Sequence, residues 1–240
     1  MMRIGLFGYG KMGRAIETAA QARGHSIAWR VQQGNRGLLT PELLREADLV
    51  IEFSQPEAAF GNVMLCLEAG LPVVSGTTGW LEQVAQVQKW CQARDGAFLW
   101  ASNFSVGVNL LFAVNRYLAR LMDQRPEYAP SVTETHHIHK LDAPSGTAIS
   151  LALELVNELE RKNGWRLYPA PAAEGDVPIV AVREGEIPGT HIVRWSSPID
   201  ELVLEHRAHN RSGFAAGAVL AAEWLLGKKG AYSMQDVLGL

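Results

Sequence analysis

Between the N-terminus and residue 101, short apolar runs alternate with segments whose apolar residues recur at helical spacing. The runs cover residues 3–7, 26–31, 48–53, 71–75 and 97–101. Strands that alternate with helices assemble into a parallel sheet with helices on both faces, so this part of the chain is predicted to be an α/β domain. Ligands of such sheets bind beyond the carboxyl ends of the strands.

The second part of the chain shows a different pattern. Apolar and polar residues alternate over 131–136, 179–183, 190–196 and 201–208. Short turn-rich intervals separate the last three runs, which is typical of a mixed or antiparallel sheet. This change of pattern predicts a second domain.

Three further helices and one loop are predicted in this part of the chain. Helical spacing covers 106–122, 146–159 and 213–226, and the loop is a proline- and alanine-rich stretch at 168–177. We expect the middle helix to end near Gly164. The last helix is rich in small residues and can return to pack on the first domain.

A glycine fingerprint lies between the first strand and the first helix. Residues 8–13 read GYGKMG, in which Gly8 permits a tight turn, Gly10 lets a pyrophosphate approach the backbone and Gly13 lets the helix pack closely on the strand. A GxGxxG motif between a strand and a helix predicts a dinucleotide-binding βαβ unit.

The end of the second strand bears on the choice of cofactor. An NAD-binding domain carries an acid there, about 20 residues beyond the glycines, to hold the ribose 2′-hydroxyl. This chain has Gln32, Gln33, Gly34, Asn35 and Arg36 instead. Because no carboxylate is present here to repel a 2′-phosphate, the sequence allows NADH or NADPH.

Three later strand ends carry small, hydroxylated or aromatic residues. Phe53 ends one strand, Gly76-Thr77-Thr78 follows the next, and 101–104 (Ala-Ser-Asn-Phe) follows the fifth. Such residues leave room for a flat ring and offer hydrogen bonds to a carboxamide. The competing interpretation is that each is an ordinary loop between a strand and a helix.

The stretch 134–148, ETHHIHKLDAPSGTA, contains the strongest candidate chemistry. His136, His137, His139 and Lys140 lie within five positions, and crowded cations disfavour one another's charged forms, which suits proton transfer near neutral pH. The step 145–147 (Ser-Gly-Thr) resembles a helix N-terminus, which attracts an anion. Together they predict a receptor for a small carboxylated molecule, and a solvated basic loop is the alternative. We expect no metal site, since the histidines lack the i, i+4 helical spacing and a carboxylate at metal-ligand spacing.

Composition excludes several classes of protein. The net charge of −3 and pI of about 6.2 argue against a nucleic-acid-binding protein, although the basic stretch would steer an anionic substrate inward. The only cysteines, Cys66 and Cys91, fit no metal motif and are expected to be free thiols in a reducing compartment. We expect neither a signal peptide nor a membrane span, and hence a cytoplasmic enzyme that binds no nucleic acid.

With GYGKMG, the GTTG turn at 76–79, ASNFSVGVN at 101–109 and THHIHKLDAPSGTA in view, the chain resembles the dihydrodipicolinate reductase family over essentially its whole length. The resemblance implies an NAD(P)H-dependent reduction of a cyclic imine dicarboxylate to tetrahydrodipicolinate, in lysine and diaminopimelate synthesis. It also implies a Rossmann dinucleotide-binding domain at 1–104 and 212–240. Residues 105–211 would form an α+β domain that binds substrate and whose open mixed sheet builds a homotetramer.

The resemblance also implies roles for individual residues. His136 would be the general acid/base and Lys140 the proton donor, while His137 would bind substrate. Gly146 and Thr147 would take a substrate carboxylate on their backbone amides, with Arg211 nearby. Matching cofactor contacts are Gly8, Tyr9, Gly10, Lys11, Met12, Gly13, Gln32, Gln33, Phe53, Gly76, Thr77, Thr78, Ala101, Ser102, Asn103 and Phe104.

Two departures from the family pattern concern the cofactor. The glycine loop is one residue shorter than in many members, and Gln32-Gln33 stands where many carry an acid-arginine pair. Two other functions remain open at this point: a related two-domain NAD(P)-dependent dehydrogenase of another amino-acid precursor, and a non-catalytic nucleotide sensor. The His136 and Lys140 pair favours an enzyme, because a sensor has no need of a proton donor.

Overall fold

The chain forms two compact units in the computed structural model, which describes residues 1–32, 34–35, 37, 39–210 and 212–240. One unit comprises Met1–Val106 and Ser212–Leu240, and the other comprises Gly107–Arg211. The C-terminal segment therefore belongs to the same unit as the N-terminal strands.

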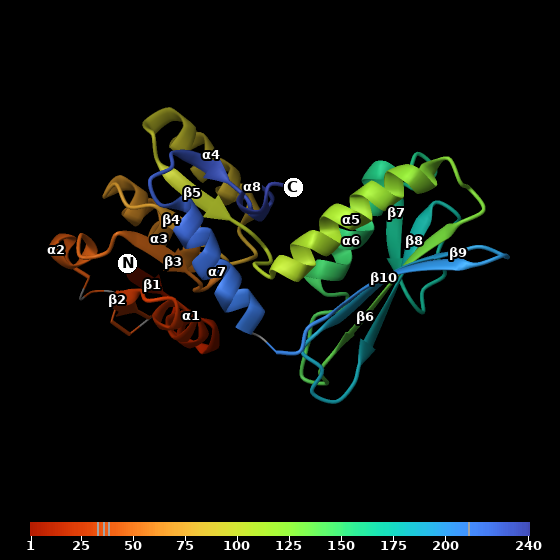
Figure 1. The fold of residues 1–240 in the computed structure, drawn as a ribbon, viewed down its shortest axis with the longest axis horizontal. Helices are drawn as coiled ribbons and strands as arrows, with labels where there is room; N and C mark the ends of the chain where they lie inside the picture. The colour runs from red at the N-terminus through yellow and green to blue at the C-terminus, as the bar shows by residue number, and fades with distance from the viewer. Residues whose placement is uncertain (33, 36, 38, 211) are drawn as a thin grey trace. The chain divides into compact units, whose positions relative to one another are not determined.

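The first unit is built on a six-stranded sheet in the order β11-β5-β4-β3-β1-β2, and every neighbouring pair is parallel (Figure 1). The strands are β1 (Arg3–Phe7), β2 (Ser26–Val31), β3 (Leu49–Glu52), β4 (Val73–Ser75), β5 (Ala97–Trp100) and β11 (Gly230–Tyr232). The strand order reverses between β1 and β3, which is where doubly wound sheets bind ligands.

Helices cover both faces of this sheet. One face packs against α1 (Lys11–Ala22), α7 (Ser212–Leu225) and α8 (Met234–Leu238). The other packs against α2 (Pro41–Leu44), α3 (Pro56–Glu68) and α4 (Leu81–Arg94). The small residues of α7 have a packing reason, since a Cβ on Gly217 would lie 1.8 Å from the Phe104 carbonyl oxygen. The prediction of an α/β fold is thus confirmed.

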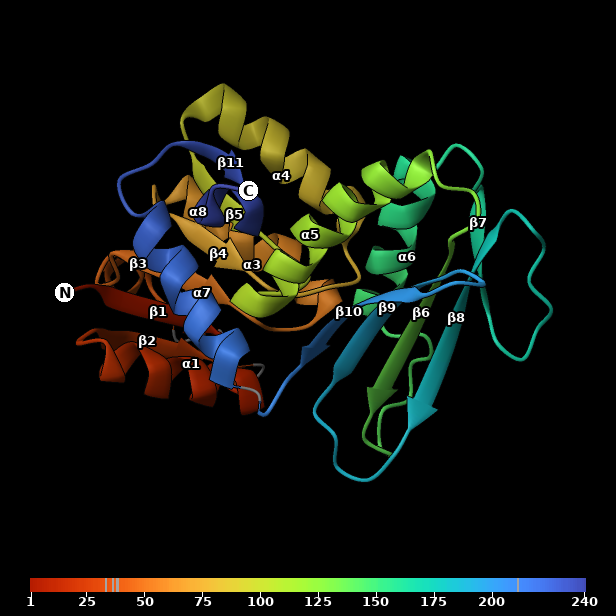
Figure 2. The same ribbon diagram turned by 45° about the vertical axis from the view of Figure 1, so that its right-hand side comes forward.

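The second unit contains a mixed five-stranded sheet in the order β10-β9-β6-β8-β7 (Figure 2). The strands are β6 (Ala129–His136), β7 (Gly164–Leu167), β8 (Asp176–Arg183), β9 (Thr190–Ser196) and β10 (Glu201–Arg207). The pairs β10/β9 and β9/β6 are antiparallel, whereas β6/β8 and β8/β7 are parallel. The predicted mixed sheet is therefore confirmed.

Two helices, α5 (Val106–Asp123) and α6 (Gly146–Glu158), pack on one face of this second sheet. Val132 on β6 and Trp195 on β9 point into the core that these helices close. Because side chains alternate along a strand, Glu134 and His136 on β6 share the buried face of Val132. The alternation of β6 thus places two polar, titratable side chains on the inner face of the sheet.

Two boundaries predicted from the sequence are wrong, and the two short strands β7 and β11 were not predicted. The helix α6 ends at Glu158, and Gly164 begins strand β7 instead of ending a helix. The predicted loop at 168–177 is shorter, because β8 begins at Asp176. Strand β11 was not predicted, since its Gly-Ala-Tyr sequence has no strand pattern and pairing with β5 defines it. Among the described residues, every helix is too short or too polar to cross a bilayer.

Candidate functional site

The turn after β1 is shaped by two glycines that the protein's own packing requires. Gly8 has φ +86°, and a Cβ there would lie 1.8 Å from the carbonyl oxygen of Phe53. A Cβ on Gly13 would lie 2.2 Å from the carbonyl oxygen of Gly8. The turn, the start of α1 and the end of β3 therefore approach one another at backbone distance.

Gly10 differs from these two glycines, because nothing lies within 4 Å of the position that its Cβ would occupy. It is the N-cap residue of α1 and is exposed. The protein's own packing does not require glycine here, so the open space is available to a ligand. Backbone N–H groups at a helix start bind phosphate, and this geometry fits a dinucleotide pyrophosphate.

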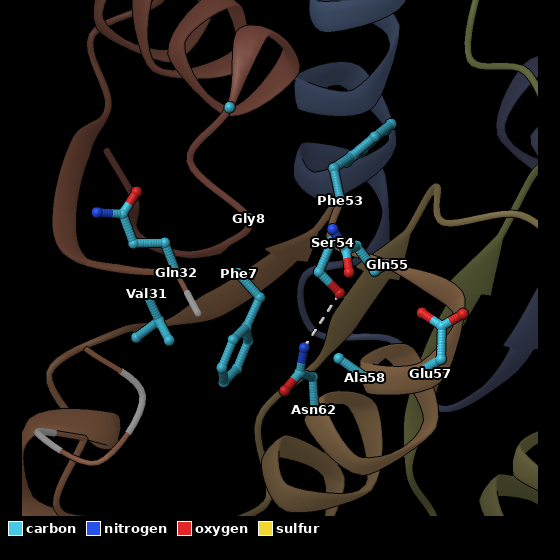
Figure 3. A pocket seen from close by; sticks show the side chains of 11 residues that line it. Phe7, Gly8, Val31, Gln32, Phe53, Ser54, Gln55, Glu57, Ala58 and Asn62 are labelled. Carbon is cyan, nitrogen blue, oxygen red and sulfur yellow. Dashed lines mark hydrogen bonds between the residues drawn. The ribbon is translucent and has the colours of Figure 1, made fainter. Parts of the chain in front are cut away.

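A cavity of about 580 Å³ opens at this turn, at the point where the strand order reverses (Figure 3). Four residues that line it, Gly8, Gly10, Gln32 and Phe53, belong to the predicted cofactor contacts. The other lining residues were not predicted from the sequence, and they are Phe7, Val31, Ser54, Gln55, Glu57, Ala58 and Asn62. Their position at the ends of β1, β2 and β3 and at the start of α3 was the signal that could have identified them.

A buried carboxylate holds the loops after β3 and β4 together. Glu52, the last residue of β3, accepts hydrogen bonds from the hydroxyls of Ser54, Ser75 (2.6 Å) and Thr77 (2.9 Å) and from the backbone N–H of Ser54 (3.0 Å). The Thr77 carbonyl accepts bonds from the indoles of Trp80 (2.7 Å) and Trp100 (2.9 Å). The predicted contact Thr77 is thus held through both its side chain and its backbone.

The predicted contacts after β3, β4 and β5 meet at the ring of Phe53. A Cβ on Gly76 would lie 2.2 Å from this ring, and the ring of Phe104 lies 5.5 Å from it between centroids. Ala101 and Asn103 are buried, whereas Thr78 and Ser102 are exposed. None of these residues after β4 and β5 is among those that line the cavity. Their role as cofactor contacts stays a prediction.

Within the glycine turn, Tyr9 is part of an ionic cluster. Its hydroxyl donates to Glu17, and the guanidinium groups of Arg14 and Arg30 lie 5.1 and 5.6 Å from its ring centroid. The hydrogen bond from Arg30 outweighs burial and lowers the pKa of Glu17 to about 2. Arg30 on β2 is therefore already paired. Lys11 is exposed and Met12 half-buried beside this cluster.

The turn after β2 is closed by Asn35. Its side-chain oxygen accepts from the Gln32 N–H at 2.7 Å, and its amide nitrogen donates to the carbonyl of Arg30 at 3.2 Å. The predicted contact Gln33, like Arg36, lies outside the described residues. Gln32 and Asn35 are both uncharged, so no carboxylate comes from the described part of this turn.

The second site is the loop from β6 to α6, where three basic side chains lie beside carboxylates. His136 bonds to Glu134 through Nδ1, Lys140 Nζ donates to both oxygens of Asp142 at 2.8 Å, and His139 Nε2 lies 3.2 Å from Glu186. The sequence predicted that these groups disfavour one another's charged forms, which stays a prediction. The structure adds three carboxylates that are close to them in space.

Glu134 is the buried centre of this site. Besides His136, its carboxylate accepts from Arg183 at 3.0 Å and from the Ser145 backbone N–H at 3.2 Å. Burial raises the pKa of Glu134, but the hydrogen bonds and charges of His136 and Arg183 outweigh burial and hold that pKa at about 2. The carboxylate is therefore ionised at neutral pH.

The start of α6 lies beside Glu134. The Ser145 hydroxyl accepts from the Ala148 N–H at 3.3 Å and lies 3.3 Å from His191 Nε2. Gly146 is exposed, with nothing within 4 Å of a Cβ position, and Thr147 is half-buried. His137 is half-buried, with its ring 6.1 Å from that of His139, and Arg211 lies outside the described residues.

His191 on β9 is a second buried imidazole, 5.1 Å from the His136 ring between centroids. Burial, with the nearby charge of His136, lowers the pKa of His191 to about 4. Folding thus disfavours protonation of His191, so the free energy of unfolding should fall as pH drops from 6.5 to about 4, by up to about 3 kcal/mol. Chemical denaturation across this pH range should show a flatter dependence for His191→Gln. The exposed His139→Gln control should keep the wild-type slope, and equal slopes for all three proteins would contradict this.

Glu134, His136 and His191 also form a group whose ligand atoms lie within 4.8 Å of one another. The sequence argument that no carboxylate accompanies the histidines is therefore wrong, since Glu134 lies two positions before His136. Arg183 and the Ser145 N–H both donate to Glu134 Oε1, and His136 Nδ1 bonds to Oε2, so both oxygens of this carboxylate already have partners within the protein.

Comparisons with known proteins agree with this architecture. A family model described as dihydrodipicolinate reductase, N-terminus, matches residues 2–104, and one described as dihydrodipicolinate reductase, C-terminus, matches residues 107–238. The chain is 44% identical over 239 residues to the 4-hydroxy-tetrahydrodipicolinate reductase of Christiangramia forsetii, with 99% of this chain and 98% of that protein covered. Its identity to the enzyme of the same name from Acinetobacter baumannii is 32% over 267 residues, covering 99% and 96%.

A solved structure shares the fold. The dipicolinate-bound dihydrodipicolinate reductase from Paenisporosarcina sp. TG-14 superposes with a TM-score of 0.79 at 22% identity, covering 98% of this chain and 99% of that one. The likeness extends over both units.

Proposed function

Since the chain belongs to the dihydrodipicolinate reductase family, its activity is that of a 4-hydroxy-tetrahydrodipicolinate reductase, and we propose that the first unit holds the cofactor and the second unit the substrate. The enzyme is an NAD(P)H-dependent oxidoreductase of lysine and diaminopimelate synthesis. Family membership sets aside both the sensor and the dehydrogenase of another precursor. The dinucleotide-binding domain is proposed as 1–104 with 212–240, and the substrate domain as 105–211.

The open start of α1 is the observation that carries the cofactor assignment. Gly10 leaves space that the protein's own atoms do not use, beside a cavity at the topological switch point. A bound reduced nicotinamide supplies a hydride. We assign the pyrophosphate to residues 8–13 and the remaining contacts to Gln32, Phe53, residues 76–78 and residues 101–104, with Gln33 included on the resemblance alone.

The substrate assignment rests on the loop from β6 to α6. A cyclic imine dicarboxylate needs a proton as well as a hydride, and needs its two carboxylates held. Lys140, positioned by Asp142, would donate the proton, and His136 would act as general acid/base. His137 and the amides of Gly146 and Thr147 would bind a carboxylate, with Arg211 nearby. The related structure with bound dipicolinate supports a ligand of this class.

A coupled assay tests the whole proposal. Aspartate semialdehyde, pyruvate and the preceding synthase generate the substrate, and oxidation of NADH and of NADPH is followed separately. Oxidation that requires the synthase is expected with at least one cofactor. Oxidation of neither, with a synthase shown to be active, would contradict the proposal.

The proposed cofactor is NADH or NADPH, because the described turn after β2 contains no acid that would repel a 2′-phosphate. Gln32→Asp should introduce repulsion against a 2′-phosphate and shift the ratio of kcat/KM toward NADH by roughly tenfold, which corresponds to about 1.4 kcal/mol. The measurement is kcat/KM for each cofactor at low ionic strength. The exposed Gln83→Asp on α4 adds the same charge away from the cavity and should leave the ratio unchanged. An unchanged ratio in Gln32→Asp would remove Gln32 from the ribose site.

A homotetramer is proposed through the face of the second sheet opposite α5 and α6. Thr133 pairs in register with Val180 and Ile192, so these β-branched side chains form a half-buried row on that face. Thr133→Arg should lower the oligomer mass in light scattering, whereas Thr133→Ser should not. A tetramer that survives Thr133→Arg would place the interface elsewhere.

A cytoplasmic location is proposed as well, in line with two buried free thiols.

A further inference from the structure

We propose that the buried ion pair Glu134–Arg183 positions the residues of the substrate site. It orients the ring of His136 and anchors the loop that carries Lys140. The proposal rests on the proposed function of that loop. Neither residue was identified from the sequence. Both are positioning residues in this proposal, because they act through His136 and the loop.

The pair lies at one end of the second sheet. Glu134 and His136 lie on β6, and Arg183, the last residue of β8, pairs in register with His136. The Glu134 side chain is fully buried, and that of Arg183 is 20% exposed. Two neighbouring parallel strands thus bring the carboxylate, the guanidinium and the imidazole to the same end of the sheet.

The Glu134 carboxylate fixes which nitrogen of the His136 ring carries a hydrogen. Glu134 is ionised and can only accept hydrogen bonds, so the Nδ1 of His136 must carry a hydrogen. This leaves Nε2 as the nitrogen that can take or give a proton. A Cβ on Gly189 would lie 3.0 Å from that Nε2, so the glycine leaves this side of the ring clear.

The Arg183 guanidinium anchors the loop that carries Lys140. Arg183 donates to the Lys140 carbonyl at 3.2 Å and to the Asp142 carbonyl at 2.6 Å. The other end of the loop is held by Glu134 itself, which accepts from the Ser145 N–H at 3.2 Å. One buried pair therefore ties the proton donor, the acid that pairs with it and the start of α6 to the sheet.

A purely structural ion pair is the competing explanation. Buried ion pairs often contribute little net stability, because desolvation offsets their attraction. An ordinary core pair, however, would have no need to bond the imidazole and three backbone groups of one loop. The other imidazole that faces His136 is His191 on β9, which burial keeps neutral. The charges of His206 on β10 and of Lys140 in the loop act on His191 in turn.

The test compares Glu134→Gln and Glu134→Asp with wild type and with Glu154→Gln. The control removes the carboxylate of a different ion pair in the same unit, Arg116–Glu154 (2.6 Å), without touching the loop. The readouts are the ¹⁵N signals of the His136 ring in the full chain without ligand, thermal melting, and kcat and KM as functions of pH. Glu134→Gln should lower kcat about 10- to 100-fold, as loss of an orienting partner does at metal-bound histidines.

The expected results distinguish a Glu134 that positions His136 from a Glu134 that only stabilises the fold. In Glu134→Gln the ¹⁵N signals of the His136 ring should no longer show the hydrogen on Nδ1. The acid limb of the plot of kcat against pH should shift along the pH axis. Cofactor KM should stay unchanged, Glu134→Asp should recover part of kcat, and Glu154→Gln should match wild type. If Glu134→Gln does not fold, Arg183→Lys is measured by the same readouts, with loss of the loop's order expected to lower kcat.

Two results would overturn the proposal. One is a folded Glu134→Gln protein whose His136 ¹⁵N signals and pH dependence of kcat are the same as those of the wild type. The other is one tightly bound zinc ion per wild-type chain that is lost in Glu134→Gln, since the carboxylate would then be a metal ligand. If His136→Gln keeps the wild-type rate, the role proposed for His136 in the reaction is contradicted. The His136 ring signals of the wild type and of Glu134→Gln still show whether Glu134 orients that ring.

Discussion

Lys140→Ala should lower kcat by roughly 10²- to 10⁴-fold, the range in which a positioned proton donor contributes. The ammonium lies at the half-buried base of the loop, 2.8 Å from both oxygens of Asp142, with 21% of its side chain exposed. Alanine removes the only group at this position that can deliver a proton. Since the proposed cofactor contacts belong to the other unit, the dissociation constant for NADPH should change by less than about twofold.

Lys140→Arg extends this test. Arginine keeps the positive charge, but its guanidinium does not give up a proton in proteins. Its kcat should therefore fall nearly as far as that of the alanine variant. Steady-state kinetics and fluorescence titration of the cofactor measure the two effects, with the exposed Lys89→Ala on α4 as control. Equal losses in kcat and cofactor affinity for Lys140→Ala would contradict the role of proton donor.

Gly8→Ala should abolish cofactor binding and destabilise the first unit. Two penalties combine here: φ of +86° disfavours any side chain, and the new Cβ would lie 1.8 Å from the Phe53 carbonyl oxygen. The first costs about 1–2 kcal/mol and the second, as overpacking, about 1–3 kcal/mol more. Relief of the clash would move the end of β3 away from β1, where the cavity lies.

Gly24→Ala is the matched control. Gly24 has nearly the same backbone angle, φ +81°, with nothing within 4 Å of a Cβ position. It should therefore show only the conformational penalty, about 1–2 kcal/mol, and bind NADPH as wild type does. Denaturant unfolding and cofactor titration of both variants separate the two causes. Equal destabilisation and equal binding would show that the approach of Phe53 to Gly8 does not shape the site.

Local pattern predicted most of the fold. The runs at 26–31 and 190–196 coincide with β2 and β9. The second run was recognisable because its side chains alternate between a buried and a more exposed face. β7 and β11 were not predicted, since each is a short strand at the edge of its sheet, without a pattern of its own. Such strands exist because a neighbour supplies hydrogen-bond partners, and the identity of that neighbour is not local information.

The candidate sites divide in the same way. The glycine turn and the loop at 134–148 were found from sequence because their functional residues are consecutive. Glu52, Arg183 and His191 were not, since each acts on residues that are more than 20 positions away or on another strand.

The order of residues along the chain thus determined the α/β class, the family and the stretches that carry the chemistry, all of which depend on neighbours in sequence. The tertiary structure decided which acid compensates which cation, and which nitrogen of His136 carries the hydrogen. Those properties depend on strand pairing, which brings β6, β8 and β9 together although intervening helices and loops separate them in sequence.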